Sequence, residues 1–300
     1  MNTIPNRLRS RLLGVLVALT TAGLVACHHP NEQARTDRDH SGHSTPTTDK
    51  ISKPDGHSPQ HGSHDQTAQA QSQVKLITPN SVTPKQPTLL TLAVQDQQGK
   101  AIPKFDVFQE KLMHLIVVSD DLRTFNHIHP EYRQNGRFEV EATFPEGGNY
   151  TLFSDYKPTG HAEEISTLKI QATGQAPPAP EIDLRRTKTI ETLQATLDSS
   201  QPQLQAGEEV TITFTLKDAG SQEPLTDLQP YLGERGHLVI LRLSSSLSRT
   251  DYIHAHALPK AKEGQVQFKT AFPKAGKYKL WGQFNRNGKI VTTDFWVQVV

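Results

Sequence analysis

Short runs of alternating apolar and polar residues begin near residue 73 and continue to the end of the chain, with turn residues about every 8–12 positions. Alternation with a period of two is typical of β-strands that bury one face. In the first half it predicts strands at Val74–Thr78, Thr88–Gln95, Leu112–Ser119, Arg137–Thr143, Asn149–Asp155 and Ile165–Ala172. In the second half it predicts strands at Ala195–Asp198, Glu209–Lys217, Gly236–Leu243, Gln265–Ala271, Lys277–Phe284 and Thr292–Val299. No helical period follows residue 26, so the folded part is predicted to be all-β.

The two halves repeat each other. The segment Phe144–Phe153 aligns with Phe272–Trp281, and Thr91–Asp96 aligns with Thr213–Asp218. A period of about 125 residues is too long for a solenoid repeat and indicates a duplicated domain. Each copy has the length and strand number of an immunoglobulin-like β-sandwich, and the Gly-x-Tyr that ends at Tyr150 is typical of a tyrosine corner in that fold. We therefore predict two tandem immunoglobulin-like β-sandwich domains.

Composition sets the boundaries of these domains. Residues 27–72 are rich in His, Ser, Thr, Pro and Gln and nearly free of large apolar side chains, which predicts a disordered His-rich tether. The first sandwich is then expected at 73–173 and the second at 183–300. A Pro-rich linker at 174–182 separates them.

The first 26 residues have the pattern of a secretory signal. Arg7, Arg9 and Arg11 precede an apolar run, Leu12–Ala26, that is short for a transmembrane helix. The run ends in Leu24-Val25-Ala26-Cys27, which resembles the lipobox of bacterial lipoprotein signals. That resemblance implies cleavage after residue 26 and acylation of Cys27, with palmitate among the attached chains. An ordinary secretory signal followed by an incidental cysteine is the alternative.

These features predict the compartment. A lipid-anchored chain would face the periplasm or the cell exterior, with the membrane as its first partner. His28, rather than Asp, follows the cysteine, which favours the outer membrane where two membranes are present. Cys27 is the sole cysteine, so no disulfide can form within the chain.

Charge and motifs exclude several classes of function. Lys and Arg total 32 against 31 Asp and Glu, a balance that gives no reason to expect nucleic-acid binding. The sequence has no Gly-x-Ser-x-Gly, His-Glu-x-x-His or phosphate loop, and lipidation would remove the only thiol. We therefore expect no enzymatic activity.

Histidine is the residue type that suggests chemistry. Seven of the 14 histidines lie in the tether, where imidazoles could collect Cu(II), Zn(II) or Ni(II) weakly or could simply be solvated. Each predicted sandwich carries a His-x-His pair on one strand and a third histidine on the strand before it. The resulting triplets are His114, His127 and His129 in the first domain, and His237, His254 and His256 in the second.

The triplets have the chemistry of a metal site. Residues two apart on a strand point to the same face, and an adjacent antiparallel strand brings the third imidazole close. Three imidazoles suit Cu(II) or Zn(II), with a position left for a further ligand. The alternative is a structural histidine network. His237 in particular shares its strand face with Val239 and Leu241, which is consistent with a position in the sandwich core.

The histidine segments also resemble a known family. Met113–Ser119, the run Phe125–Pro130 and the run Phe144–Pro158 resemble the YtkA-like group of bacterial secreted and lipid-anchored proteins. The resemblance implies an immunoglobulin-like fold and a role in copper handling in the envelope. The second half departs from the pattern: Gly236 replaces the methionine before the first histidine, Ala257 replaces the proline after His-x-His, and Gln283 replaces Asp155. If Met113 or Asp155 were ligands, the second domain would bind differently.

The sequence thus predicts an envelope-facing lipoprotein that binds a transition metal through its His triplets. Copper is the expected ion and zinc the alternative, for metal buffering, delivery or resistance. The competing hypothesis is an adhesion or assembly module whose paired sandwiches bind another envelope protein, with no metal.

Overall fold

The computed structural model of the chain describes residues 71–77 and 81–300. The predicted signal peptide at 1–26, the predicted lipidation site Cys27 and all but the last two residues of the predicted tether lie outside this part. The described residues form two β-sandwiches, each with an immunoglobulin-like arrangement, as the alternation predicts. The helical content of the described chain is a single turn, η1 (Arg249–Asp251). Both sandwiches belong to one compact unit of the chain.

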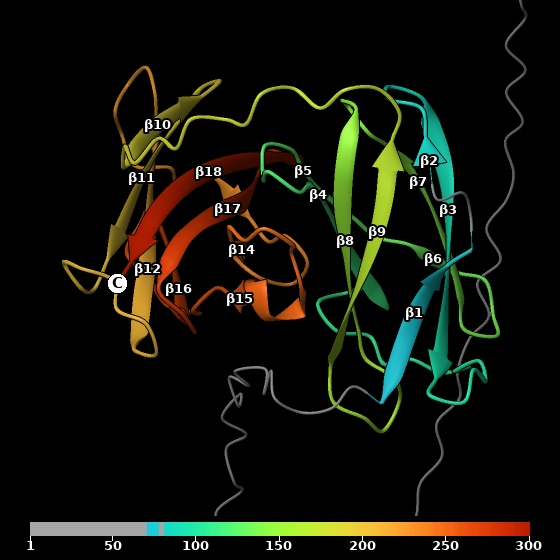
Figure 1. The fold of residues 1–300 in the computed structure, drawn as a ribbon. Helices are drawn as coiled ribbons and strands as arrows, with labels where there is room; N and C mark the ends of the chain where they lie inside the picture. The colour runs from blue at the N-terminus through green and yellow to red at the C-terminus, as the bar shows by residue number, and fades with distance from the viewer. Residues whose placement is uncertain (1–70, 78–80) are drawn as a thin grey trace, which may run out of the picture. The chain divides into compact units, whose positions relative to one another are not determined.

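The first sandwich packs a four-stranded sheet against a five-stranded sheet (Figure 1). The four-stranded sheet has the order β1 (Ser72–Leu76), β3 (Pro87–Asp96), β7 (Arg137–Thr143) and β6 (Glu131–Tyr132). The five-stranded sheet has the order β2 (Ser81–Val82), β9 (Glu164–Ala172), β8 (Gly148–Tyr156), β4 (Met113–Ser119) and β5 (Phe125–Ile128). Neighbouring strands are antiparallel except β2 and β9, which pair in parallel.

The second sandwich repeats this plan. One sheet has the order β10 (Thr187–Ile190), β11 (Leu193–Ser199), β12 (Glu209–Asp218) and β16 (Gln265–Ala271). In the other sheet β17 (Gly276–Arg286) pairs with both β18 (Lys289–Val299) and β14 (His237–Arg242), and β14 pairs with β15 (Tyr252–His256). The short β13 (Leu228–Gln229) pairs with the end of β17. By position, β4, β5, β8 and β9 correspond to β14, β15, β17 and β18.

The predicted strands all form, with ends that differ by three residues or fewer. The largest differences are at β1, which begins and ends two residues before the predicted range, and at β18, which begins at Lys289 instead of Thr292. The strands β5 and β15 were expected only as the carriers of the His-x-His pairs, without bounds, and β2, β6, β10 and β13 were not predicted. These last four have only two to four residues, which is too short for an alternating pattern to be recognised.

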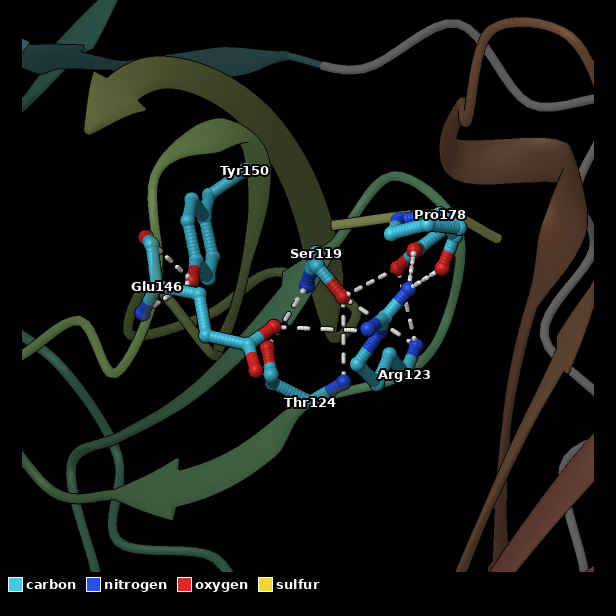
Figure 2. A network of polar contacts seen from close by, with 7 residues as sticks. Ser119, Arg123, Thr124, Glu146, Tyr150 and Pro178 are labelled. Carbon is cyan, nitrogen blue, oxygen red and sulfur yellow. Dashed lines mark hydrogen bonds and ion pairs between the residues drawn. The ribbon is translucent and has the colours of Figure 1, made fainter. Parts of the chain in front are cut away.

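The tyrosine corners confirm the fold type. The hydroxyl of Tyr150 donates to the backbone carbonyl of Glu146 at 2.9 Å, and the hydroxyl of Tyr278 donates to that of Lys274 at 2.7 Å. The first corner lies beside the β4–β5 turn, as Figure 2 shows, where Arg123 pairs with Asp121 and donates to the backbone carbonyl of Pro178. This contact holds the predicted Pro-rich linker against the first domain.

The strands β4 and β14 are buried on both faces, which explains why both are apolar almost throughout. Leu115 and Leu238 face the core of their own sandwiches, whereas Ile116 and Val239 face the opposite way. The outward-facing side chains of the two domains form one buried group, which we call the interdomain cluster. Its members are Ile116, Val118, Leu122, Phe153, Ile165, Val239, Leu241, Leu247, Tyr252, Trp281 and Trp296.

Aromatic stacking strengthens the contact between the domains. Phe125 stacks on Trp281 with ring centroids 4.8 Å apart, and Phe153 stacks on Tyr252 at 5.0 Å. The core position considered for His237 is therefore wrong. His237 and Val239 share a face, but that face meets the other domain and not the interior of the second sandwich.

Candidate metal centre

The histidines of the first domain converge where β4 and β5 pair. Antiparallel register sets Ile116 opposite His127, so that His114, two residues earlier on β4, lies on the same face as the His-x-His pair. The ring of His129 lies 5.0 Å from that of His114 and 4.8 Å from that of His127, measured between centroids. Each of the three offers a ligand atom, and these atoms all lie within 4.8 Å of one another. The structure thus brings the first predicted triplet together.

Hydrogen bonds orient the two buried imidazoles of this triplet. His114 Nε2 donates to the carbonyl of Phe108 at 3.3 Å, and His127 Nδ1 lies 2.7 Å from Gln283 Oε1. Gln283 Nε2 in turn donates to Thr292 at 3.3 Å, which directs the amide oxygen towards His127. Because each neutral imidazole carries one proton, the remaining nitrogens, His114 Nδ1 and His127 Nε2, then carry lone pairs.

Those two nitrogens face each other at 3.1 Å. Two imidazole nitrogens bound at about 2.0–2.1 Å to one ion lie about 2.9 Å apart in square-planar geometry and about 3.3 Å apart in tetrahedral geometry. The observed separation falls between these values. Facing lone pairs repel each other unless a proton or a metal ion lies between them, so this pair fits a shared cation.

His129 provides a third donor. Its Nε2 is buried and has no hydrogen-bond partner among the described residues. A buried polar nitrogen without a partner costs about 1–3 kcal/mol, which a bound ion would offset. The residue itself is partly exposed, so this side of the triplet lies nearest to solvent.

The second domain holds an equivalent pair. His237 Nδ1 faces His254 Nε2 at 3.4 Å, and His237 Nε2 donates to the carbonyl of Tyr231 at 3.0 Å, as His114 does to Phe108. His256 pairs with His237 through the backbone of β15, and its side chain lies outside the described part of the structure. The second predicted triplet is therefore described for two of its three imidazoles.

A side chain of each domain forms a hydrogen bond with a histidine of the other domain. His254 Nδ1 lies 3.0 Å from the carboxylate Oδ2 of Asp155, which belongs to the first domain. His127 is held in the same way by Gln283 of the second domain. Asp155 and Gln283 occupy corresponding positions on β8 and β17, so the interdomain contact is close to two-fold symmetric. A hydrogen bond from the second nitrogen of an imidazole to a carboxylate or carbonyl is typical of metal-binding histidines.

Burial keeps the first-domain imidazoles neutral at pH 7. Burial is the largest cause for all three: it lowers the pKa of His127 to about 4 and, with His127 and Lys111 nearby, that of His129 to about 3. The pKa of His114 is held far below its ordinary value by burial and then by His254, His127 and His129. Neutral imidazole is the form that binds metal ions.

Met113 and Asp155, considered above as further ligands, and His161, the fourth described histidine of the first domain, have other positions. Met113 lies in the core of the first sandwich, on the opposite face of β4, as regular strand geometry predicts. Asp155 is fully buried and contacts His254 of the other domain. His161 is exposed and lies beside Ser72 and Glu164, apart from the triplet. Sequence reasoning did not identify Gln283 as a partner of His127, although the repeat aligns it with Asp155.

Among the described residues no helix has the length and apolar character needed to cross a membrane.

Solved structures that resemble the chain are built from similar sandwiches. The Escherichia coli adhesin FdeC is 18% identical over 77% of this chain and 64% of its own, with a TM-score of 0.24. Invasin, described as a bacterial integrin-binding protein, is 12% identical over 75% of this chain and 39% of its own, with a TM-score of 0.22. A two-domain fibronectin type III segment of chicken tenascin is 11% identical over 75% of this chain and 97% of its own, also with a TM-score of 0.22.

This chain spans less than two thirds of the adhesin and of invasin. At these identities and TM-scores the likenesses carry no argument about function. No curated protein matches the chain significantly. The resemblance to the YtkA-like group stays a prediction.

The chain does match the model of one protein family. The model of the family described as "Domain of unknown function (DUF8832)" matches residues 67–173 and, separately, residues 188–300. The two matches coincide with the two sandwiches and together cover well over half of the chain. The protein therefore belongs to the DUF8832 family and carries two copies of its domain.

Proposed function

We propose that this protein binds a transition-metal ion at its buried histidines and handles that ion in the cell envelope. The observation that carries the proposal is the triplet His114, His127 and His129, whose ligand atoms lie within 4.8 Å of one another. The unpartnered Nε2 of His129 and the facing nitrogens of the other two support it. We assign no catalytic step to the site.

Copper is the ion we expect, with zinc as the alternative. Imidazole nitrogen suits both ions, and Cu(II) stands above Zn(II) in intrinsic affinity for such ligands. Met113 faces away from the site, so no thioether at that position favours Cu(I). An oxidising envelope would supply the cupric form.

The envelope location rests on the sequence. The signal-like segment at 1–26 and the lipobox cysteine Cys27 support a lipid anchor, with the sandwiches facing the periplasm or exterior. The histidines of the segment 27–72 would gather ions loosely and raise their concentration near the buried site. Buffering, delivery and metal resistance are all consistent with this arrangement.

A metal titration tests the proposal. The sample is the full chain with Cys27→Ser and with His28, His29, His40, His43, His57, His61 and His64 each replaced by Gln, which we call the parent chain. Cu(II) and Zn(II) are titrated against a competing chelator. We expect tight binding in the parent chain and at least a tenfold loss in His127→Gln, whereas the exposed control His161→Gln should bind as the parent does. A parent chain that takes up neither ion would refute the proposal.

That negative result would favour the alternative, an adhesion or assembly module. In that case the histidines would only join the two domains, and the paired sandwiches would bind another envelope protein. A chain that binds no metal but retains a stable fold would direct attention to that hypothesis.

A further inference from the structure

Four of the buried histidines surround a common point, two from each domain. The six separations between the ring centroids of His114, His127, His237 and His254 all fall between 5.3 and 6.4 Å. The separations across the interface, 5.8–6.4 Å, are hardly longer than those within a domain, 5.3 and 5.6 Å. Six nearly equal separations define an approximate tetrahedron of imidazoles.

The size of this tetrahedron suits one metal ion. With nitrogen ligands at about 2.0–2.1 Å, four tetrahedral imidazoles have ring centroids about 5.2 Å apart. The observed separations begin at that value and exceed it by about 1 Å at most, so small inward shifts of the rings would complete the set. Relative exposure is 0% for His114 and His237, 6% for His254 and 9% for His127, which excludes a surface site.

The outward nitrogen of each ring meets an acceptor. In His114 and His237 the acceptor is a backbone carbonyl just before the strand, that of Phe108 or Tyr231. In His127 and His254 it is a side chain of the other domain. The two nitrogens of an imidazole point in nearly opposite directions, so each inner nitrogen is turned towards the other histidine of its pair. Docking of the two domains therefore sets the orientation of the ligands.

We infer that one metal ion is held between the two sandwiches by imidazoles of both domains, and that this ion fastens the domains together. The sequence suggested instead two independent triplets, one in each domain. His129 would supply a further donor on the side of the first domain that is nearest to solvent. The inference rests on the proposed function, because it concerns which of the same histidines bind one ion together.

A shared site has a kinetic consequence. The ion would be bound by side chains of both domains, so its release would require the contact between the domains to loosen at least locally. Trp281 stacks on Phe125 across the interface and is not one of the proposed ligands. Loosening this stack should therefore release the ion faster without removing a ligand.

The first experiment uses the parent chain defined above and Cu(II). A shared site predicts one tightly bound ion per chain. It also predicts that His237→Gln and His254→Gln each weaken binding at least tenfold, as much as His127→Gln does. Electron paramagnetic resonance should show coupling to four or more nitrogens in the parent chain. His161→Gln is the matched control and should change neither the affinity nor the spectrum.

The possible outcomes distinguish a failure of the proposed function from a failure of the shared site. No binding by the parent chain overturns the proposed function. Tight binding of two ions, or binding that depends on the first-domain histidines but is unchanged in His237→Gln and His254→Gln, overturns the shared site and leaves the function standing. If a histidine variant fails to fold, the number of ions bound by the parent chain and the number of coupled nitrogens still distinguish a shared site from separate sites.

The second experiment measures the rate at which a strong chelator removes Cu(II). We expect at least a tenfold faster loss from Trp281→Ala than from the parent chain. Phe105→Ala is the control, because Phe105 packs on the core of the first sandwich, away from the interdomain cluster. Near-ultraviolet circular dichroism verifies that both variants remain folded. Equal rates in the two folded variants would overturn the role of the interface.

Discussion

The metal-free protein should lose stability between pH 7 and pH 5 because of its buried histidines. Burial lowers the pKa of His127 to about 4, whereas an unfolded histidine titrates near about 6.5. The unfolded chain therefore takes up a proton as the pH falls through about 6.5, and the folded chain does not. The contribution to stability is complete above the unfolded pKa, decreases as the pH falls below it, and stops changing below about pH 4.

The magnitude follows from these two pKa values. At pH 5 protonation favours the unfolded state by a factor of about 30 for His127, which is about 2 kcal/mol, against about 0.2 kcal/mol at pH 7. The pKa of His114 is lowered further by burial and by its neighbouring histidines, and it contributes about the same loss over this interval. The free energy of unfolding should thus fall by about 4 kcal/mol, with a smaller addition from the partly exposed His129. Carboxylates titrate mainly below pH 5 and overlap little with this range.

Urea unfolding of the chelator-treated chain at pH 7, 6 and 5 measures this loss. The chain has only two tryptophans, Trp281 and Trp296, and both belong to the interdomain cluster, so their fluorescence reports on that interface. In His127→Gln the pH-dependent loss should shrink by about half, while His161→Gln should retain the full dependence. A stability that is flat from pH 7 to pH 5, or a His127→Gln variant with the full loss, would show that the buried histidines do not cause the pH dependence.

Three further predictions concern the fold and the bound ion. Tyr278→Phe removes the corner hydrogen bond to Lys274 and should lower the free energy of unfolding by about 1 kcal/mol in urea titrations, and an unchanged midpoint would contradict the structure. Gly236→Met introduces the residue type that the first domain has at this position, but it places a Cβ 2.9 Å from the ring of Phe284. The melting temperature should therefore fall, whereas the exposed control Gly220→Met should change it little. Cu(II) at 100 times its dissociation constant should stabilise the parent chain by about 2.7 kcal/mol, and a melting temperature that does not depend on the ion would show that binding is not linked to folding.

The duplication has left the two copies unequal both on the core side and at the interface. Gly236 stands where the first domain has Met113, and the ring of Phe284 occupies the space that a side chain would need. Gln283 stands where the first domain has Asp155, so one histidine of the set meets a neutral amide and its counterpart meets a carboxylate. A carboxylate raises the basicity of the imidazole that donates to it. The second-domain pair should accordingly bind the ion more strongly than the first-domain pair does.

Local sequence patterns were enough to predict the longer strands, the duplication and the first histidine triplet. Alternation with a period of two is a property of neighbouring residues, and it predicted β3, β4, β7 and β8 to within one residue. The triplet is also local, because β4 and β5 are consecutive antiparallel strands and their register follows from the short turn between them. The tyrosine corners could be predicted because Gly-x-Tyr recurs at matching places in both halves.

The faces of β4 and β14 that meet the other domain, by contrast, are set by how the two sandwiches pack. A strand that is apolar on both faces has no alternation to distinguish its two sides, so His237 could be assigned to the wrong one. The pairs His127–Gln283 and His254–Asp155 join residues 156 and 99 positions apart, and no local pattern encodes such contacts. They form because the apolar outer faces of the two sheets are buried against each other.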